Sequence, residues 1–292
     1  MVRKDHIRLW DKAHKKRDNI AKVQERRIMA LYQTMLNDYK SKLDKYSEDR
    51  MTKSELLELQ RELEALNLEL SKEVVTLIRQ GIDKVVLLAS STTVEMLLSE
   101  YKGDKELVKS ILDNLFNSGN KNASKAILNG TIYKDGKELS ERIWMHNKIF
   151  NNDVKLIISK GIATKKSSYE IAKDIEKYVN PKVKKLWDWK KVYSTNNKKI
   201  EYNAQRAART AVNHAWQESV KENCRRNPYT TYIEWRSALA HGRTCEQCRS
   251  RDGQRYLVDQ LPYDHPMGLC VMVPVLDKSL EEIAIELKEQ YG

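Results

Sequence analysis

Residues 52–81 read TKSELLELQRELEALNLELSKEVVTLIRQG, and this stretch decides the class of fold. Thr52 and Glu55 have the spacing of a capping box, which marks the first turn of a helix. The pattern predicts a long amphipathic helix that ends near Gly81 and whose leucine seam packs within the chain or against a partner subunit. An internal helix hairpin is the more common role of such a seam. The apolar residues of the seam recur every three or four positions: Leu56, Leu59, Leu63, Leu66, Leu70, Val74 and Leu77.

The composition of the 292-residue chain agrees with a helical fold. Charged residues make up 32% of it, with only 10 glycines and 5 prolines, and this favours long solvated helices over a β-sandwich. A hydrophobic content of 40% is enough for two or more modest domains. We therefore expect an α+β protein that is predominantly α-helical. We expect a helical N-terminal region over 1–130, a helical region with a basic connector over 131–200, and a small C-terminal α+β module over 201–292.

Further helices are expected along the N-terminal half. Residues 1–42 alternate basic clusters with apolar residues at helical spacing, which predicts one or two basic helices. The apolar residues within 107–115 predict another helix, closed near Gly119. Residues 130–137, GTIYKDGK, place an Asp-Gly turn between β-prone residues and predict a local hairpin. A helix over 139–161 follows.

The C-terminal part mixes helices and strands. Ser167 and Glu170 have the spacing of a cap for a short helix. Small residues within 201–226 predict a helix that packs closely on its neighbours. The stretch 229–235, YTTYIEW, predicts the clearest strand of the chain, because its residues favour extended backbone. A second β-like run, CVMVPV, begins at Cys270, and a final helix is expected from Ser279 to Gln290.

The charge of the chain suits a partner that carries phosphates. The sequence has 53 basic and 41 acidic residues, a net charge of +12 and a pI near 9.3. A solvated helix face or a lysine-rich loop is a simpler explanation of each basic cluster. The candidate contacts with double-stranded DNA are Lys15, Lys16 and Arg17, then Lys184, Lys185, Lys190 and Lys191 beside two tryptophans, and finally Arg225 and Arg226.

Neither a membrane anchor nor secretion is expected. The best apolar run, Val85 to Ala89, is far shorter than the roughly 18 residues of a membrane span. The basic N-terminus lacks the apolar core of a signal peptide. We expect a protein that is made in the cytoplasm and stays there or in something assembled there.

Three of the four cysteines lie in one short segment and suggest a metal site. Cys245 and Cys248 are separated by two residues, a spacing at which both sulfurs can face one ion. His265 and Cys270 complete a tetrahedral set for structural zinc, and His241 is a rival fourth ligand. Small buried thiols with a surface histidine are the alternative. A redox function of the Cys-x-x-Cys pair is less favoured, since the pair does not follow a strand and open a helix.

The order of motifs in the C-terminal module resembles the phage Mu F-like head morphogenesis domain. The resemblance covers about residues 204 to 275, and the segment from the turn at residue 135 to Ser167 is similar to the helical part of minor capsid proteins of Gram-positive phages. Two positions depart from the family pattern: Ala211 stands in place of a glutamate, and Gly268 in place of a cysteine. The matching residues are Ala208-Arg209-Thr210, Asn213, Trp235, Arg243-Thr244-Cys245-Glu246-Gln247-Cys248, Asp252-Gly253, Pro262, His265-Pro266, Cys270 and Val273-Pro274.

This resemblance implies a minor capsid protein and not an enzyme. Such a protein is made in the host bacterial cytoplasm and resides in the virion, in the capsid interior. The implied partners are the portal protein, a scaffold or major capsid protein, and double-stranded DNA. The implied roles are head assembly and DNA packaging or ejection.

Two other classes of function were weighed against this one. A metal-dependent nuclease would use His241 or His265, and a transferase would use Glu234, but an enzyme needs an open metal position or a nucleophile beside a base, and the sequence displays neither. A zinc-ribbon DNA-binding protein would need a free recognition helix. The alanine-rich face of residues 201–226 argues against a helix that is free to enter a groove.

Overall fold

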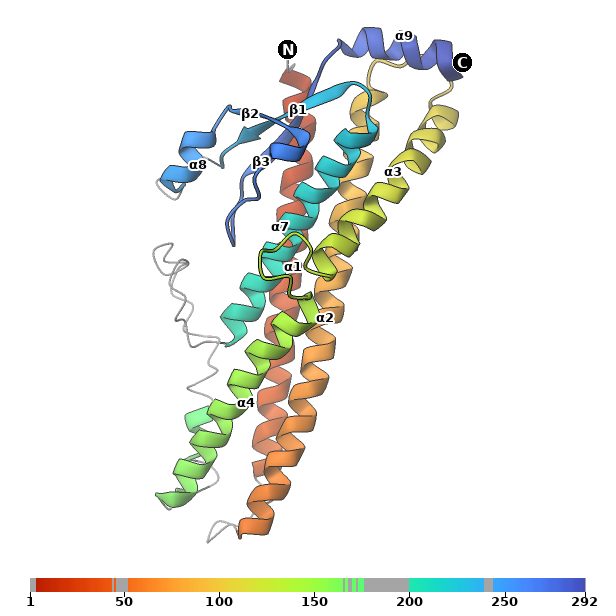
Figure 1. Ribbon diagram of the computed structural model, residues 1–292. Helices are drawn as coiled ribbons and strands as arrows, with labels where there is room; N and C mark the ends of the chain where they lie inside the picture. Colours follow the sequence, from red (N-terminus) through yellow and green to blue (C-terminus); the bar gives the residue numbers. More distant parts are fainter. Residues whose placement is uncertain are drawn as a thin grey trace. The chain divides into compact units, whose positions relative to one another are not determined.

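The computed structural model shows a predominantly helical α+β protein, as expected (Figure 1). The structure describes residues 4–43, 45, 52–164, 166–167, 170–171, 173–175, 200–238 and 244–291. Its helices are α1 (Lys4–Leu43), α2 (Lys53–Leu97), α3 (Lys105–Leu128), α4 (Leu139–Ala163), α7 (Ile200–Arg226), α8 (Glu246–Arg251), the 3-10 helix η2 (Val258–Gln260) and α9 (Leu280–Tyr291). Its strands are β1 (Thr230–Arg236), β2 (Arg255–Leu257) and β3 (Val271–Leu276).

The chain divides into two compact units that combine segments distant in sequence. The first unit contains Met1–Lys22, Arg79–Gly136 and Arg209–Gly292, and the second contains Val23–Ile78 and Lys137–Ala208. The long helices α1, α2 and α7 therefore contribute residues to both units. The division into consecutive segments at residues 130 and 200 stays a prediction.

Helix α2 begins as the sequence predicts but does not end at Gly81. The capping box forms, because Thr52 N donates to Glu55 Oε2 at 2.7 Å and Glu55 N donates to Thr52 Oγ1 at 3.2 Å. Beyond Gly81 the helix continues to Leu97 with Val85 and Val86 buried. Burial of these side chains outweighs the cost of a helical glycine, which is about 1 kcal/mol.

Helix α3 also continues past its predicted end. Asp104 caps its N-terminus, and its carboxylate accepts from the backbone N–H groups of Glu106 and Leu107 at 3.1 Å. At Gly119 a Cβ atom would lie 3.0 Å from Arg226 Nη1 and 3.2 Å from Glu222 Cβ. The glycine is thus a point of close contact with α7 and not a helix terminator.

The hairpin predicted over 130–137 is wrong. These residues form consecutive turns, and Gly136 adopts a positive φ of 58°. An Asp-Gly pair satisfies a tight turn whether or not strands flank it. Helix α4, which lies in the second unit, then covers the predicted range 139–161 and ends two residues later.

Helix α7 is the most deeply buried element of the first unit. All residues from Ala211 to Cys224 are buried, polar ones included. Ser219 donates to Val86 O at 3.1 Å, and Ser90 donates to the Asn120 side chain, so hydrogen bonds link α7, α2 and α3 inside the unit. Such satisfied polar contacts fix the register in which helices pack.

The three strands form an antiparallel sheet of order β2-β1-β3 (Figure 1). Ile233 of β1 pairs with Tyr256 of β2 and with Pro274 of β3, while Trp235 pairs with Met272. Both predicted strands, 229–235 and the run that begins at Cys270, are therefore confirmed, and each observed end lies one residue further along the chain.

Helix α9 closes the core of the first unit. Ser279 and Glu282 form a capping box, with bonds of 2.7 and 3.2 Å. Behind it, Leu280, Ile283 and Leu287 pack in one cluster with apolar residues of α2 and α3. The predicted C-terminal helix is confirmed.

A buried polar seam organises the second unit. Asn147 of α4 accepts from Tyr32 Oη at 2.8 Å and donates to Ser71 Oγ at 2.6 Å, while its carbonyl accepts from Asn67 Nδ2 at 2.9 Å. These bonds join α1, α2 and α4.

The predicted cap at Ser167 also forms, since Ser167 N donates to Glu170 Oε2 at 2.9 Å.

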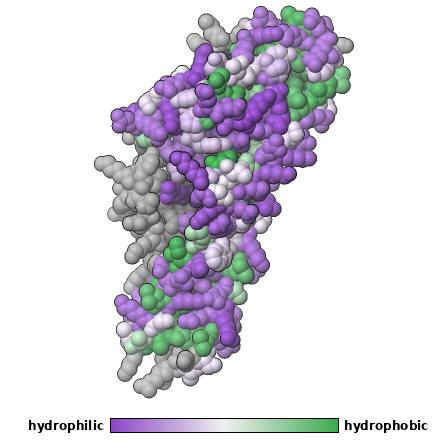
Figure 2. Space-filling model, viewed as in Figure 1, coloured by the Kyte–Doolittle hydropathy of each residue, from purple (hydrophilic) through white to green (hydrophobic). Residues whose placement is uncertain are grey.

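The described surface is largely polar. Figure 2 shows hydrophilic residues over most of the face that it draws. Within the described ranges, the helices contain no stretch that combines the length and the hydropathy of a membrane span.

Candidate metal centre

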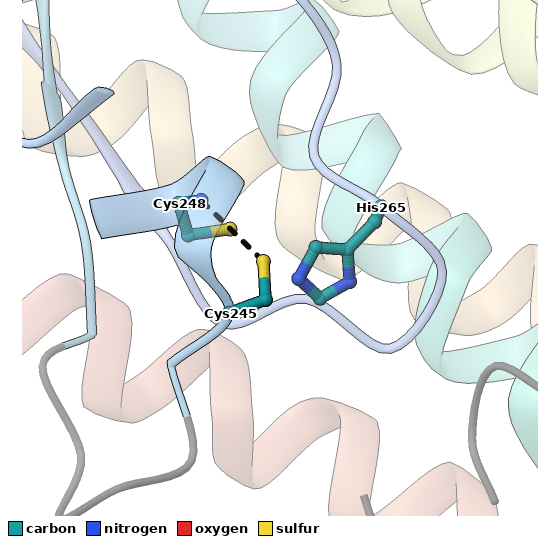
Figure 3. A group of neighbouring side chains, drawn as sticks. All are labelled: Cys245, Cys248 and His265. Atoms are coloured by element: carbon teal, nitrogen blue, oxygen red, sulfur yellow. Dashed lines mark hydrogen bonds between the residues drawn. The ribbon is translucent and has the colours of Figure 1, made fainter. Parts of the chain in front are cut away.

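The short helix α8 brings the two cysteines of the Cys-x-x-Cys motif together. Contrary to the expectation from the sequence, the pair opens a helix: Cys245 is the N-cap residue of α8, and its Sγ accepts from the backbone N–H of Cys248 at 3.4 Å (Figure 3). His265 comes from the loop between η2 and β3, and its ring lies beside the two sulfurs. One ligand atom from each of these three residues lies within 4.8 Å of the others.

A second group of ligand atoms shares Cys248 with the first. Cys248, Asp264 and Cys270 also offer three atoms within 4.8 Å of one another, and all three residues are buried. Cys270 directly precedes β3. The two groups define what we call the metal cluster: Cys245, Cys248, Asp264, His265 and Cys270. Each group lies close enough for its own three residues to hold a metal ion. The four ligands predicted from the sequence are divided between the two groups: Cys245 and His265 belong to the first, Cys270 to the second, and Cys248 to both.

Asp264 is the member of the cluster that sequence analysis missed. Its side chain has no exposed surface. Its oxygens accept from the backbone N–H groups of His265 at 2.9 Å and Cys270 at 3.0 Å. The carboxylate therefore ties together the two ends of the loop 264–270. Its position next to His265 was the only signal that could have identified it.

Helix α7 anchors this loop from the other side. His214 Nε2 lies 2.9 Å from Asp264 O, and Asp264 N donates to Gln217 Oε1 at 3.1 Å. Met267, whose φ is 65°, donates its N–H to Thr210 Oγ1 at 3.2 Å. The loop thus has a fixed place on a buried helix, which pre-positions the donors that it carries.

Arg17 supports the cluster and is not a surface residue, so its prediction as a DNA contact is wrong. Its side chain is 2% exposed. The guanidinium donates to Asn213 Oδ1 at 2.9 Å and to Cys270 O at 3.1 Å. Its neighbours Lys15 and Lys16 are exposed on α1. The alternation follows from helical geometry, which turns every third or fourth residue toward the core.

The buried thiols hold their protons tightly. Burial and, after it, the Asp264 carboxylate raise the pKa of Cys270 to about 12. Burial also raises the pKa of Cys248, with contributions from Cys245 and the same carboxylate. A redox pair requires a thiol with a lowered pKa, so the raised pKa of these thiols disfavours disulfide exchange, and a metal ion would have to displace their protons on binding. The four cysteines are not joined by disulfides.

The remaining predicted DNA contacts and the rival ligand have different surroundings. Arg225 pairs with Glu222 at 2.5 Å and with Asp259 at 2.8 Å. Arg226 pairs with Glu222 at 2.5 Å. Neighbouring carboxylates therefore compensate the charge of both arginines. The other predicted DNA contacts and the rival metal ligand lie outside the described ranges: Lys184, Lys185, Lys190, Lys191 and His241.

Glu234, the candidate for a transferase, belongs to the sheet and not to the metal cluster. It lies on β1 opposite Arg255 of β2, and Arg255 Nε approaches Glu234 Oε2 at 3.4 Å. The pair is a cross-strand ion pair of a kind that stabilises a sheet modestly.

Comparisons of the chain with protein-family models, with curated proteins and with solved structures gave no match.

Proposed function

We propose that the chain is a minor capsid protein that acts in the head morphogenesis of a tailed bacteriophage. One observation carries the proposal: residues that match the Mu F-like pattern are bonded to one another or to one loop. Thr210 and Asn213 of α7 bond to Met267 and Asp264 of the cysteine loop. The placement of these matching residues around one loop supports the proposal.

The turn after α8 supports the same proposal. Gly253 has a φ of 74°, which glycine adopts without strain. Asp252 Oδ1 accepts from Ser237 N at 2.7 Å, and Gly253 N donates to Trp235 O at 2.8 Å. The Asp-Gly motif therefore joins α8 to the end of β1, which is a structural role.

We infer that the metal cluster holds structural zinc through Cys245, Cys248, Cys270 and His265. Thiolate and imidazole are the donors that zinc prefers, and four protein ligands leave no open position for catalysis. When bound, the ion links α8 and the start of β3 to the loop between them. Each thiol that binds releases its proton, and the charge of the ion would stabilise the thiolates that burial disfavours.

The proposed partners are the portal protein, a scaffold or major capsid protein, and double-stranded DNA in the capsid interior. The exposed Lys15 and Lys16 and the net charge of +12 support sequence-independent contact with DNA.

A zinc-ribbon regulator is less favoured, because it needs a recognition helix free to enter a groove. Helix α7 buries every residue from Ala211 to Cys224.

The proposal is tested by mass spectrometry of purified phage particles, full and emptied of DNA. The abundance of this chain is measured relative to the portal protein in both preparations. A few copies per portal in full heads support a minor capsid protein, and loss from emptied heads adds a role in ejection. Absence from every particle and from assembling heads contradicts the proposal.

A further inference from the structure

Asp264 is a buried carboxylate that the proposed ligand set does not use. An ionised carboxylate removed from water requires a compensating charge or strong hydrogen bonds. Its hydrogen bonds come from neutral donors: two backbone N–H groups, the Cys248 thiol and, at 3.4 Å, Asn213 Nδ2. The guanidinium of Arg17 binds Asn213 Oδ1 instead. Among the described residues, Asp264 pairs with His265 at 3.8 Å, and this histidine carries charge only when it is protonated.

The carboxylate faces the buried thiols of the cluster. Cys248 Sγ lies 3.7 Å from Asp264 Oδ1 and donates its hydrogen to that oxygen. With Cys270, these residues form the three-donor group in which all ligand atoms lie within 4.8 Å of one another. A metal ion in this group would replace the thiol proton that now bonds to the carboxylate, and the carboxylate oxygen would then bind the ion directly.

Gly268 leaves room for the carboxylate of Asp264. A Cβ atom on residue 268 would lie only 2.0 Å from Asp264 Oδ2 and 2.1 Å from Asp264 Cγ. The carboxylate thus occupies the space that a side chain of residue 268 would fill. Residue 268 contributes no metal-binding side chain, and a carboxylate oxygen of Asp264 lies in the space that such a side chain would occupy.

We propose that Asp264 is a further ligand of the metal ion and binds on the buried side of the centre beside Cys248 and Cys270. The inference rests on the zinc centre proposed above and adds an oxygen donor to it. Carboxylate oxygens bind zinc at about 2.0–2.2 Å, and zinc accepts a fifth ligand in some sites. On binding, the Cys248 thiol proton that now bonds to the carboxylate leaves to solvent.

The test compares the full-length chain with its Asp264→Asn variant after both are saturated with ¹¹³Cd²⁺. The ¹¹³Cd NMR shift depends on the number and type of donor atoms, so loss of an oxygen ligand changes the shift of the fully loaded protein. Zn²⁺ affinity is also expected to fall at least about 10-fold. If Asp264 only positions the loop, the affinity falls while the shift of the saturated protein stays the same, and this outcome overturns the inference.

A second variant tests the same ligand without removing it. Gly268→Ala keeps the carboxylate but forces it away from its position, so we expect the same direction of change in the ¹¹³Cd shift. Asp252→Asn is the matched control, because it alters a turn carboxylate outside the cluster and should leave the shift unchanged. If the unaltered chain binds neither Zn²⁺ nor Cd²⁺, both the zinc centre and this inference fail. If it binds them and both variants retain its shift, only this inference fails.

Discussion

Arg17 shows how a single buried charge holds a loop in place. Its guanidinium spans Asn213 of α7 and the carbonyl of Cys270, residues that lie 196 and 253 positions away in the chain. We expect Arg17→Met to lower the free energy of unfolding by about 2–3 kcal/mol, because hydrogen bonds to a charged donor are lost and their acceptors stay buried. Urea denaturation measures the change. Lys16→Met, at an exposed position of the same helix, should stay within about 0.5 kcal/mol of the unaltered chain.

His14 makes the stability of the first unit depend on pH. Burial lowers the pKa of His14 well below its ordinary value of 6.5, and the charge of Arg17 lowers it further. Below pH 6.5 the unfolded chain binds a proton that the folded chain does not, so the free energy of unfolding falls as the pH falls. One such group contributes a slope of at most about 1.4 kcal/mol per pH unit.

The variant His14→Phe should reduce this slope between pH 6.5 and pH 5. Phenylalanine keeps a ring against Trp216, whose centroid lies 5.0 Å from that of His14. Urea denaturation at several pH values compares the two proteins. An unchanged slope in the variant would show that His14 does not hold a lowered pKa in the folded state.

At the scale of elements, Gly119 sets the distance between α3 and α7. Because a Cβ there already lies 3.0–3.2 Å from Arg226 and Glu222, a larger side chain must separate the helices. We expect Gly119→Leu to cost about 1–3 kcal/mol, although leucine favours a helix more than glycine does. Lys121→Leu, on the exposed side of α3, is the control. A stabilised Gly119→Leu variant in thermal denaturation would contradict close packing at this point.

The sequence predicted most elements but not the ends of α2 and α3. The capping box at Thr52 and the β-prone run before Arg236 are local signals, and they located the start of α2 and the strand β1. The continuation of α2 past Gly81 and of α3 past Gly119 depends on contacts with other helices, which local spacing does not encode. The turn predicted at residues 135 and 136 forms, but the residues on either side of it form no strands.

The metal cluster divides in the same way. Cys245, Cys248, His265 and Cys270 were identified because their residue types and spacing are characteristic of metal ligands. Asp264 was missed because a carboxylate is usually solvated, and only the fold shows that this one is buried beside thiols. Arg17 was misassigned for the converse reason, since its basic neighbours suggested a surface while its partners lie far away in sequence.

For the whole molecule, the proposed contact with DNA predicts a dependence of binding on salt concentration. If Lys15 and Lys16 each neutralise a phosphate, the double variant Lys15→Ala/Lys16→Ala should weaken binding to duplex DNA of any sequence. The slope of log affinity against log salt concentration should fall by about 2, since each contact contributes about 0.9. Fluorescence anisotropy over a series of salt concentrations measures both quantities. Removing an exposed lysine of α9 with Lys288→Ala is the control, and an equal loss in both variants would mean that only net charge, and no surface on α1, attracts DNA.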